Sequence, residues 1–296
     1  MSKAIKLKKF SKVNIEISNI CNLQCSFCPE VIREKKIMSV DLFRHIIAQV
    51  APLTELVCLH LMGDPLVHPK LSQLVDICEE FQTKIFFVTN GVLLRDDKMD
   101  LLLRSPFQQV NFSLHSYFDN HPGQNPTPYL EKIFHFTEKA FELRPDLYLN
   151  YRLWNLNDVS GSKTDNSVML TRVCERFGQP VPTVLDVRQR KSIRLKNRLY
   201  LHFDTEFVWP SLDLEILGSR GRCHGLSSHF GILVDGTVVP CCLDKEAAIP
   251  LGNIAAEPIH DILNSERALN ILNGFRQKNL VEDLCQRCQY IERFGS

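Results

Sequence analysis

Three cysteines lie within eight positions near the start of the chain, in the stretch ISNICNLQCSFCPEV at residues 17–31. Cys21, Cys25 and Cys28 have neither a fourth cysteine nor a histidine beside them. A structural zinc site needs four protein ligands, whereas a cubane iron–sulfur cluster bound by three thiolates keeps one iron free to bind another molecule. The spacing therefore favours an iron–sulfur cluster with an open iron, and a zinc site is the alternative.

A second group of cysteines occupies the C-terminal quarter in the form Cys-x17-Cys-Cys-x42-Cys-x2-Cys; its members are Cys223, Cys241, Cys242, Cys285 and Cys288. Four thiolates complete either a zinc tetrahedron or a closed cubane cluster, and a terminal Cys-x2-Cys serves both. Spacing alone leaves these two kinds of metal centre open.

Both cysteine groups must be positioned by the elements around them, and short β-rich runs alternate with helical patterns through the first two thirds of the chain. The predicted strands are VNIEI (13–17), LVCLHL (56–61), KIFFVT (84–89), QVNFSL (109–114), LYLNYRL (147–153) and TVLDV (183–187). The predicted helices span residues 39–51 with Ser39 as N-cap, 69–81, 96–104, 128–143 and 166–177. Six such units are too few for a closed eight-stranded barrel, so we predict an α/β fold, a partial (β/α)6 TIM-like barrel with its site at the C-terminal strand ends.

The pattern changes after about residue 188, where a basic and then aromatic stretch without helix periodicity predicts a linker. Its basic part, 188–198, is expected to be a solvated loop, with contact to a substrate anion or RNA as the alternative. The segment GILVDGTVVPCC predicts a hairpin with Asp235-Gly236 as a two-residue turn, and a helix is predicted from about 257 to 278. We therefore predict a core domain at 1–205 and a small hairpin-plus-helix domain at 206–296.

Length and composition are those of an ordinary globular protein: 296 residues, 44% hydrophobic and 23% charged, with a formal net charge of +1. This charge balance indicates no attraction to nucleic acid or to an acidic membrane. No run of signal-peptide or membrane-spanning length is found, so the chain is expected to be cytoplasmic without membrane contact. In such a chain, eleven cysteines favour metal or redox chemistry over disulfides.

The first cysteine group, with Phe27 before its third cysteine, resembles the radical S-adenosylmethionine (radical SAM) superfamily. The resemblance implies that Cys21, Cys25 and Cys28 bind a [4Fe–4S] cluster whose open iron chelates the methionine part of S-adenosylmethionine (SAM). Reductive cleavage of SAM then yields a 5'-deoxyadenosyl radical. An external electron donor such as flavodoxin or ferredoxin is implied as a partner.

Other segments match the family's cofactor pocket in the order that its core requires. Met62-Gly63-Asp64-Pro65, after the second strand, resembles the Gly-Gly-Glu-Pro segment that meets the methionine amino group, with Met for the first Gly and Asp for Glu. The resemblance also implies cofactor-pocket roles for Asn90, Ser113 and His115 at later strand ends. Each segment alone is also explained as a turn or a hydrogen-bonded polar group. Arg152 and Asn155 are further candidates, with packing or solvent exposure as their alternative.

The C-terminal cysteines resemble the SPASM/twitch extensions, which bind auxiliary [4Fe–4S] clusters. A full SPASM domain has seven cysteines for two clusters, so this group predicts a twitch-type domain with one cluster. The implied ligands are Cys223, Cys241, Cys285 and Cys288, with Cys242 as the alternative to Cys241. A cluster closed by four cysteines has no open iron, and its implied role is electron transfer.

The family's chemistry leaves the substrate open. Oxidation (dehydrogenation) of a small sugar-like molecule is the leading hypothesis; modification of a ribosomal peptide by oxidation, crosslinking or epimerisation is the rival, and RNA modification ranks below both. The first strand begins by Val13, which leaves no room for an N-terminal peptide-recognition domain and counts against the rival, although such a domain can be a separate protein. In an epimerisation Cys242 would donate a hydrogen atom; its alternative role is packing. The non-enzyme alternative is a structural protein in which both cysteine groups hold zinc.

The remaining cysteines and several histidines carry no metal-binding spacing. Predicted strand and helix faces assign three cysteines to the core, namely Cys58, Cys78 and Cys174. Four histidines are expected to be structural, namely His68, His121, His224 and His229. The aromatic stretch 203–210 is expected to pack the extension onto the barrel.

Overall fold

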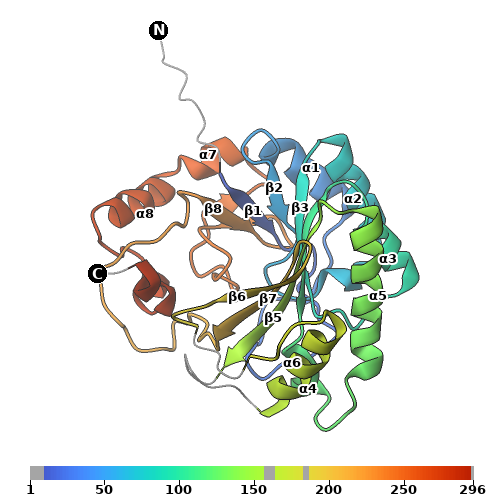
Figure 1. Ribbon diagram of the computed structural model, residues 1–296. Coiled ribbons are helices and arrows are strands. Elements are labelled where there is room, and N and C mark those ends of the chain that lie inside the picture. Colours follow the sequence, from blue (N-terminus) through green and yellow to red (C-terminus); the bar gives the residue numbers. More distant parts are fainter. Residues whose placement is uncertain (1–9, 157–163, 183–186, 295–296) are drawn as a thin grey trace.

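The computed structural model describes residues 10–156, 164–182 and 187–294. Its first half alternates strands and helices as expected (Figure 1). The strands are β1 (Lys12–Ile15), β2 (Leu56–Cys58), β3 (Lys84–Thr89), β4 (Phe107–Ser113) and β5 (Tyr148–Leu156). The helices are α1 (Val40–Val50), the 3-10 turn η1 (Pro65–Val67), α2 (Leu71–Glu80), α3 (Asp96–Leu102), α4 (Ser116–Asn120), α5 (Thr127–Leu143) and α6 (Thr164–Arg176).

Local sequence explains why these elements form. Ser39 caps α1 by accepting a hydrogen bond from the Leu42 amide at 3.1 Å, as predicted. The apolar residues of α1 recur at helical spacing, so one face of the helix is buried against the sheet. In β3, the residues after the exposed Lys84 are buried or half-buried on both faces, as expected for a strand inside a parallel sheet.

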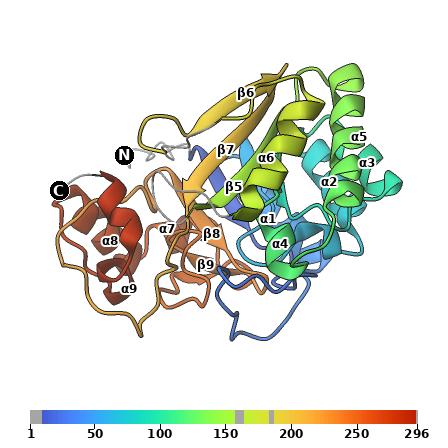
Figure 2. The ribbon, with the colours of Figure 1, turned by 60° about the horizontal axis from the view of Figure 1, so that its bottom comes forward.

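The strands form one open ten-stranded sheet in the order β10-β9-β8-β1-β2-β3-β4-β5-β7-β6. Neighbours from β8 to β7 in this order are parallel, and the two ends of the sheet do not pair with each other. The prediction of a partial, open α/β barrel is confirmed. Helices α2, α3 and α5 cover the outer face, and the C-terminal helices lie on the opposite side of the sheet (Figure 2).

The predicted linker after residue 188 is wrong. Residues Ser192–Lys196 form β6 and Leu199–Thr205 form β7, and these two strands pair with each other antiparallel. Strand β7 also pairs parallel with β5, so it supplies the sixth parallel strand of the core. Its alternation of apolar and polar residues is a strand signal that the neighbouring basic run obscured. Most of the strand predicted at 183–187 lies outside the described residues.

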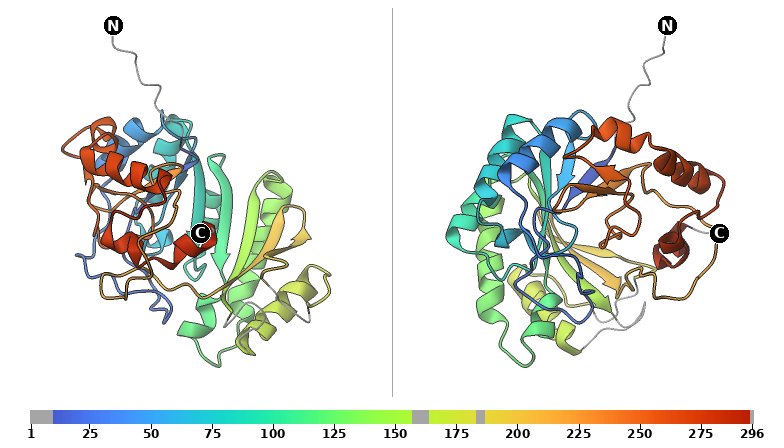
Figure 3. Two further views of the ribbon diagram at one scale, coloured as in Figure 1. Left: turned by 90° about the vertical axis from the view of Figure 1, so that its left-hand side faces the viewer. Right: turned by 180° about the vertical axis from the view of Figure 1, so that it is seen from behind.

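The C-terminal segment adds to the same sheet. Its elements are β8 (His229–Ile232), β9 (Thr237–Val239), β10 (Gly252–Asn253), α7 (Ile259–Leu263), α8 (Glu266–Arg276), α9 (Asp283–Gln286) and the 3-10 turn η2 (Gln289–Phe294). Strand β8 pairs parallel with β1, with Val13 opposite Phe230, so the C-terminal segment continues the sheet beside its first strand. Viewed from behind, the C-terminal elements lie across the opening of the curved sheet (Figure 3).

The predicted hairpin of this segment is confirmed with a longer loop. The Leu233 amide donates to the Thr237 carbonyl at 2.8 Å, so the loop contains three residues, 234–236, rather than two. Gly236 has φ +90°, the left-handed conformation that such a loop needs.

The single helix predicted from about 257 to 278 is wrong: α7 ends at Leu263, and Ser265 caps a second helix, α8, by accepting a hydrogen bond from the Ala268 amide at 3.3 Å. The domain boundary at 205/206 stays a prediction; β7 ends at Thr205, and the sheet continues through β8. Within the described ranges, no helix is long and apolar enough to cross a membrane.

Candidate active site

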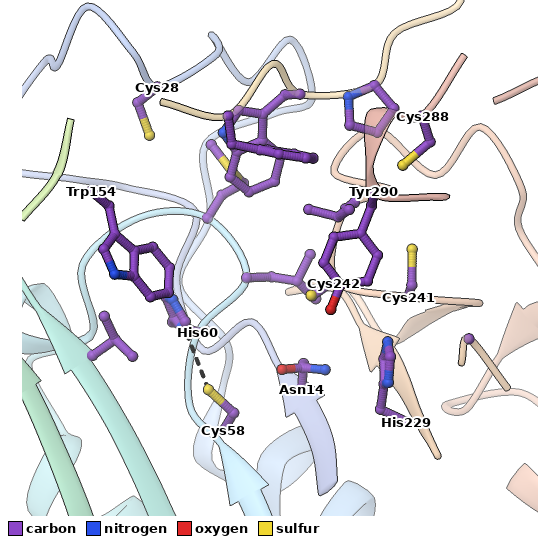
Figure 4. A pocket seen from close by; sticks show the side chains of 18 of the residues that line it. Asn14, Cys28, Cys58, His60, Trp154, His229, Cys241, Cys242, Cys288 and Tyr290 are labelled. Atoms are coloured by element: carbon purple, nitrogen blue, oxygen red, sulfur yellow. Dashed lines mark hydrogen bonds between the residues drawn. The ribbon is translucent and has the colours of Figure 1, made fainter. Parts of the chain in front are cut away.

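A cavity of about 630 Å³ opens inside the curved sheet. Both cysteine groups line it: Cys21, Cys25 and Cys28 on one side, and Cys223, Cys241, Cys242, Cys285 and Cys288 on the other. Figure 4 shows Cys28 across the cavity from Cys241 and Cys288. Sites in parallel α/β folds form at the C-terminal strand ends because successive loops meet there. A molecule in this cavity therefore lies between the two cysteine groups.

Helix α4 holds the first cysteine loop in place. The Asp119 carboxylate accepts hydrogen bonds from the Ser26 amide at 2.5 Å and the Ser26 hydroxyl at 2.6 Å. The Asn120 amide nitrogen donates to Cys25 Sγ at 3.1 Å. Neither residue is predictable from the sequence, because α4 has only five residues and shows no periodicity.

A second set of contacts fixes the end of this loop to the C-terminal segment. Arg33 donates to both oxygens of buried Glu16, at 2.9 and 3.0 Å, and to the carbonyl of Lys245 at 2.6 Å. The Glu246 carboxylate accepts from the Ile32 and Arg33 amides at 3.0 and 3.1 Å. Because residues more than 210 positions apart share these bonds, the two cysteine groups are held in one framework.

The first cysteine loop fits an iron–sulfur cluster. Besides Asn120, the Asn90 side chain donates to Cys21 Sγ at 3.7 Å, and such N–H···S contacts are among the features that tune cluster potentials. The pKa of Cys25 is raised to about 12 and that of Cys28 to about 11, mainly by burial and in part by neighbouring thiols. Without metal these thiols are neutral, and metal binding must displace their protons.

The segment after β2 packs tightly against the cysteine loop. Gly63 has φ +73°, and a β-carbon there would lie 2.5 Å from the Ser18 carbonyl oxygen and 2.6 Å from that of Ile20. The Asp64 amide donates to the same Ile20 carbonyl at 3.0 Å. Only glycine allows this approach, so Gly63 sets the distance between two segments of the cavity wall.

The Asp64 carboxylate joins two strand ends. It accepts from the Leu66 amide at 2.9 Å, from the Thr89 hydroxyl at 2.8 Å and from the Asn90 amide at 2.7 Å. Burial raises its pKa, and these hydrogen bonds oppose the rise. Asp64 and Asn90, predicted separately, are thus in direct contact, while Pro65 begins η1 and does not line the cavity.

Replacing Gly63 by alanine is expected to destabilise the fold. A left-handed backbone costs a residue with a β-carbon about 1–2 kcal/mol, and the clash with two carbonyls adds to this. Gly123→Ala is the matched control because Gly123 has φ +71° with nothing within 4 Å of its β-carbon position. Urea unfolding should show a larger loss for Gly63→Ala; equal losses would mean that the close approach contributes nothing.

Ser113, His115 and Phe27 also line the cavity, as predicted. The His115 Nδ1 lies 3.0 Å from the Arg152 carbonyl oxygen, which can only accept, so Nδ1 carries the proton and Nε2 is left as an acceptor. Burial lowers the pKa of His115 to about 4, so the ring is neutral. Phe27 packs on this ring at 4.9 Å between centroids and joins the cysteine loop to the end of β4.

The C-terminal cysteines lie close enough to raise one another's pKa values. Burial raises the pKa of Cys241, and the thiols of Cys242, Cys223 and Cys285 raise it further. The pKa of Cys288 is raised to about 11, first by burial and then by Cys223 and Cys242. A site built from four such thiols can hold a closed cluster or a zinc ion.

Cys241 and Cys242 face different surroundings. The side chain of Cys241 lies beside the Gly225 backbone, within the cysteine group. Cys242 packs against Leu61, Leu233 and Val239 of the sheet, and its pKa is influenced by Lys12 of β1. This difference favours Cys241 as the ligand and leaves Cys242 facing the barrel.

The spacing of the side chains bears on the choice between zinc and iron–sulfur clusters. In the described part of the chain, no three Cys, His, Asp or Glu side chains are placed to hold one metal ion. Zinc draws four thiolates to about 2.3 Å from a single centre, whereas a cubane binds each thiolate to a different iron. Three thiols in the first loop leave one position open, which a cubane cluster tolerates and a structural zinc site does not.

Cys58 and three histidines lie in the cavity wall without having been predicted there. Cys58 is 1% exposed, so its assignment to the interior is right, but its thiol lines the cavity at 3.2 Å from His60 Nδ1 (Figure 4). Burial raises the pKa of Cys58 to about 12 and lowers that of His60 to about 3. His224 and His229, expected to be structural, also line the cavity. Neither short motifs nor spacing signalled these positions.

Of the remaining candidate residues, some line the cavity and others do not. Arg152 lines the cavity, whereas Asn155 does not and accepts a hydrogen bond from Asn166 at 2.9 Å. Of the basic run, no residue from 188 to 198 lines the cavity. Phe203 of the aromatic stretch is buried in β7, and Phe207 packs on the Tyr290 ring at 6.5 Å between centroids, so the stretch contacts both the barrel and the extension as predicted.

Comparison with known proteins agrees with these features. Residues 15–159 match the family model of the radical SAM superfamily, and residues 223–289 match that of SPASM, an iron–sulfur cluster-binding domain. The chain is 26% identical over 281 residues to the antilisterial bacteriocin subtilosin biosynthesis protein AlbA of Bacillus subtilis, covering 84% of this chain and 58% of AlbA. It is 21% identical to the SAM-dependent 2-deoxy-scyllo-inosamine dehydrogenase of Niallia circulans, covering 96% of this chain and 94% of that protein.

Solved structures share the fold. BtrN in complex with AdoMet and 2-DOIA superposes with a TM-score of 0.60 at 17% identity, covering 95% of this chain and 94% of BtrN. Streptococcus suis SuiB bound to its precursor peptide SuiA gives a TM-score of 0.62 at 18% identity, covering 95% of this chain and 71% of SuiB.

An open α/β barrel with three cysteines after its first strand and more in a C-terminal extension defines an iron–sulfur enzyme of the partial-barrel type. The chain belongs to the radical SAM superfamily and carries a C-terminal SPASM domain. It is a radical SAM enzyme of oxidoreductase type, with SAM and [4Fe–4S] clusters as cofactors. These predictions are confirmed.

Proposed function

We propose that this enzyme oxidises a small, sugar-like molecule held between the two cysteine groups. When bound, the open-iron cluster and SAM supply a 5'-deoxyadenosyl radical that removes a hydrogen atom from the substrate. The observation that carries the proposal is the single cavity lined by both cysteine groups. Its volume of about 630 Å³ must take SAM and the clusters as well as the substrate, so it favours a small substrate.

The proposed residue roles follow the geometry. Cys21, Cys25 and Cys28 hold the SAM-binding cluster, with Asn90 and Asn120 donating to two of the sulfurs. Four C-terminal cysteines hold a closed cluster for electron transfer, namely Cys223, Cys241, Cys285 and Cys288. Asp64 and Gly63 shape the wall against which the methionine part binds, and Ser113, His115 and Phe27 line the adjoining wall. An external flavodoxin or ferredoxin is the proposed electron donor.

The dehydrogenase of Niallia circulans supports oxidation of a small molecule because the two chains match over nearly their full lengths. Peptide modification is the second candidate, favoured by the likeness to AlbA and to SuiB bound to its precursor peptide. The chain spans 58% of AlbA and 71% of SuiB, so the match leaves substantial parts of both proteins uncovered.

Product analysis in deuterated buffer separates oxidation from epimerisation. If the enzyme oxidises an alcohol, the product carbon gains no solvent deuterium, and Cys242→Ala still yields product. If Cys242 donates a hydrogen atom, its exchangeable thiol proton carries solvent deuterium into the product, and Cys242→Ala stops product but not 5'-deoxyadenosine formation. Cys58→Ala is the companion variant because Cys58 is the other thiol outside the proposed ligand sets that lines the described cavity. Deuterium bound to the carbon from which the hydrogen atom is removed would contradict the proposed oxidation.

A further inference from the structure

Two positively charged side chains face the cavity floor from different strands. Lys12 begins β1, and Arg152 lies in β5; both line the cavity. The Lys12 ammonium lies 5.7 Å from the centroid of the Phe86 ring, and the Arg152 guanidinium carbon lies 5.8 Å from the same centroid. The two cations therefore approach one ring on β3, although 140 positions separate them in the sequence.

Neither cation has an acidic partner in the described part of the chain. In that part of the chain, the charged groups of Lys12 and Arg152 instead contact aromatic rings. Arg152 lies over the Trp154 ring as well, at 4.2 Å from its centroid. The nearby acids are engaged elsewhere: Asp64 by Thr89 and Asn90, and Asp204 by Lys191 at 3.8 Å. A half-buried cation without a counter-ion is costly, and an anion in the cavity removes that cost.

Both charges influence the same two side chains of the cavity wall, His60 and Cys58. Lys12 and Arg152 each help to lower the pKa of His60, after burial, and each opposes the rise in the pKa of Cys58. Burial lowers the pKa of Arg152 itself to about 10, as expected for a guanidinium with little solvent and no acid beside it. The imidazoles of His60 and His229 are neutral here, so they add hydrogen-bonding groups and not charge.

We propose that Lys12 and Arg152 bind an anionic group of the substrate, a carboxylate or a phosphate, at the floor of the cavity. The inference deepens the proposed function, since it assumes that a small substrate occupies this cavity. Guanidinium and ammonium groups form charge-assisted hydrogen bonds with both anions. The substrate class is then a sugar acid, a sugar phosphate or a similarly small anion.

The carboxylate of SAM is the competing source of negative charge. The family's pattern has the methionine part beside the first cysteine loop, which follows the C-terminal end of β1. Lys12 lies at the opposite end of that strand, about 10 Å away at 3.3 Å per residue. An anion that contacts Lys12 is therefore distinct from one bound at the cysteine loop.

Isothermal titration of the reconstituted enzyme with SAM tests the proposal with three probes: glucose, glucuronate and glucose 6-phosphate. At least one of the two anions should bind ten-fold or more tightly than glucose. Lys12→Met and Arg152→Met should each reduce this preference to about two-fold, whereas Lys12→Arg should retain it. Comparing the two anions shows whether the site takes a carboxylate or a phosphate. If neither binds more tightly than glucose, the proposal is wrong.

The affinity for SAM and a control variant show whether Lys12 acts on SAM or on the probes. The affinity of Lys12→Met for SAM should stay within two-fold of wild type. If the affinity for SAM falls ten-fold and the wild-type enzyme binds neither anion more tightly than glucose, the positive charge serves SAM and the proposal is wrong. Lys84→Met removes an exposed charge from β3 and should change neither affinity. If Lys12→Met unfolds at a lower urea concentration, Lys12→Gln serves as a second variant. These titrations need no turnover. The proposed anion site can therefore be contradicted while 5'-deoxyadenosine is still produced, and it can be supported when no 5'-deoxyadenosine forms.

Discussion

Replacing Cys21, Cys25 and Cys28 together by alanine abolishes formation of 5'-deoxyadenosine. The radical depends on an iron that protein thiolates leave open, and in the described part of the cavity this loop is the one with three thiols and no fourth. The reconstituted wild-type enzyme should contain about eight irons per chain if two cubanes form, and the triple variant about four. Iron analysis and chromatography of the products after reduction with SAM measure both effects.

Cys174→Ala is the control for this triple variant. Cys174 is buried in α6 and lines no part of the described cavity, so its loss should leave iron content and SAM cleavage unchanged. Undiminished 5'-deoxyadenosine from the triple variant would show that these cysteines do not hold the SAM-binding cluster.

Replacing Cys285 and Cys288 together by alanine should separate the two cysteine groups functionally. The variant is expected to lose about half of its iron, since two of four ligands cannot retain a cubane. It should keep some uncoupled cleavage of SAM, because the first loop is held by α4 and by Arg33 rather than by α9. Substrate oxidation should fall below detection because no closed cluster remains for electron transfer.

Single replacements of Cys241 and Cys242 then identify the fourth ligand. Cys241→Ala should reproduce the loss of iron, whereas Cys242→Ala should retain about eight irons per chain. The reverse result would make Cys242 the ligand and leave Cys241 as the free thiol. Full iron in the Cys285 and Cys288 double variant would instead contradict the second cluster itself.

Some of the site was predictable from local sequence. The cysteine spacing and the strand before it were sufficient to predict a SAM-binding loop, and Gly63, Asp64 and Asn90 were predicted at later strand ends. Such features are predictable because a ligand set, a cap or a turn depends on residues close together in the chain. The predicted linker failed for a related reason: the basic residues beside β7 hid its alternation, which tertiary burial of Leu199, Leu201 and Phe203 makes evident.

Other features depend on contacts that no local pattern specifies. Periodicity indicates which face of a strand is buried but not which strand lies beside it. The pairing of β8 with β1, and the bond from Arg33 to Lys245, join segments that are far apart in the chain. Cys58 illustrates the limit: the sequence predicted burial, and only the curved sheet decides that its thiol faces the cavity.

By itself, the sequence determined the chemistry of this enzyme, because three thiols in one loop and more in a second segment specify what can be bound. The tertiary structure alone decided that both groups line a single cavity, and that Lys12 and Arg152 face the same Phe86 ring across its floor. The physical reason is that a parallel sheet brings residues that are distant in the chain to one end or one face. The order of its strands is set by the burial of both strand faces in the folded protein and not by the local sequence.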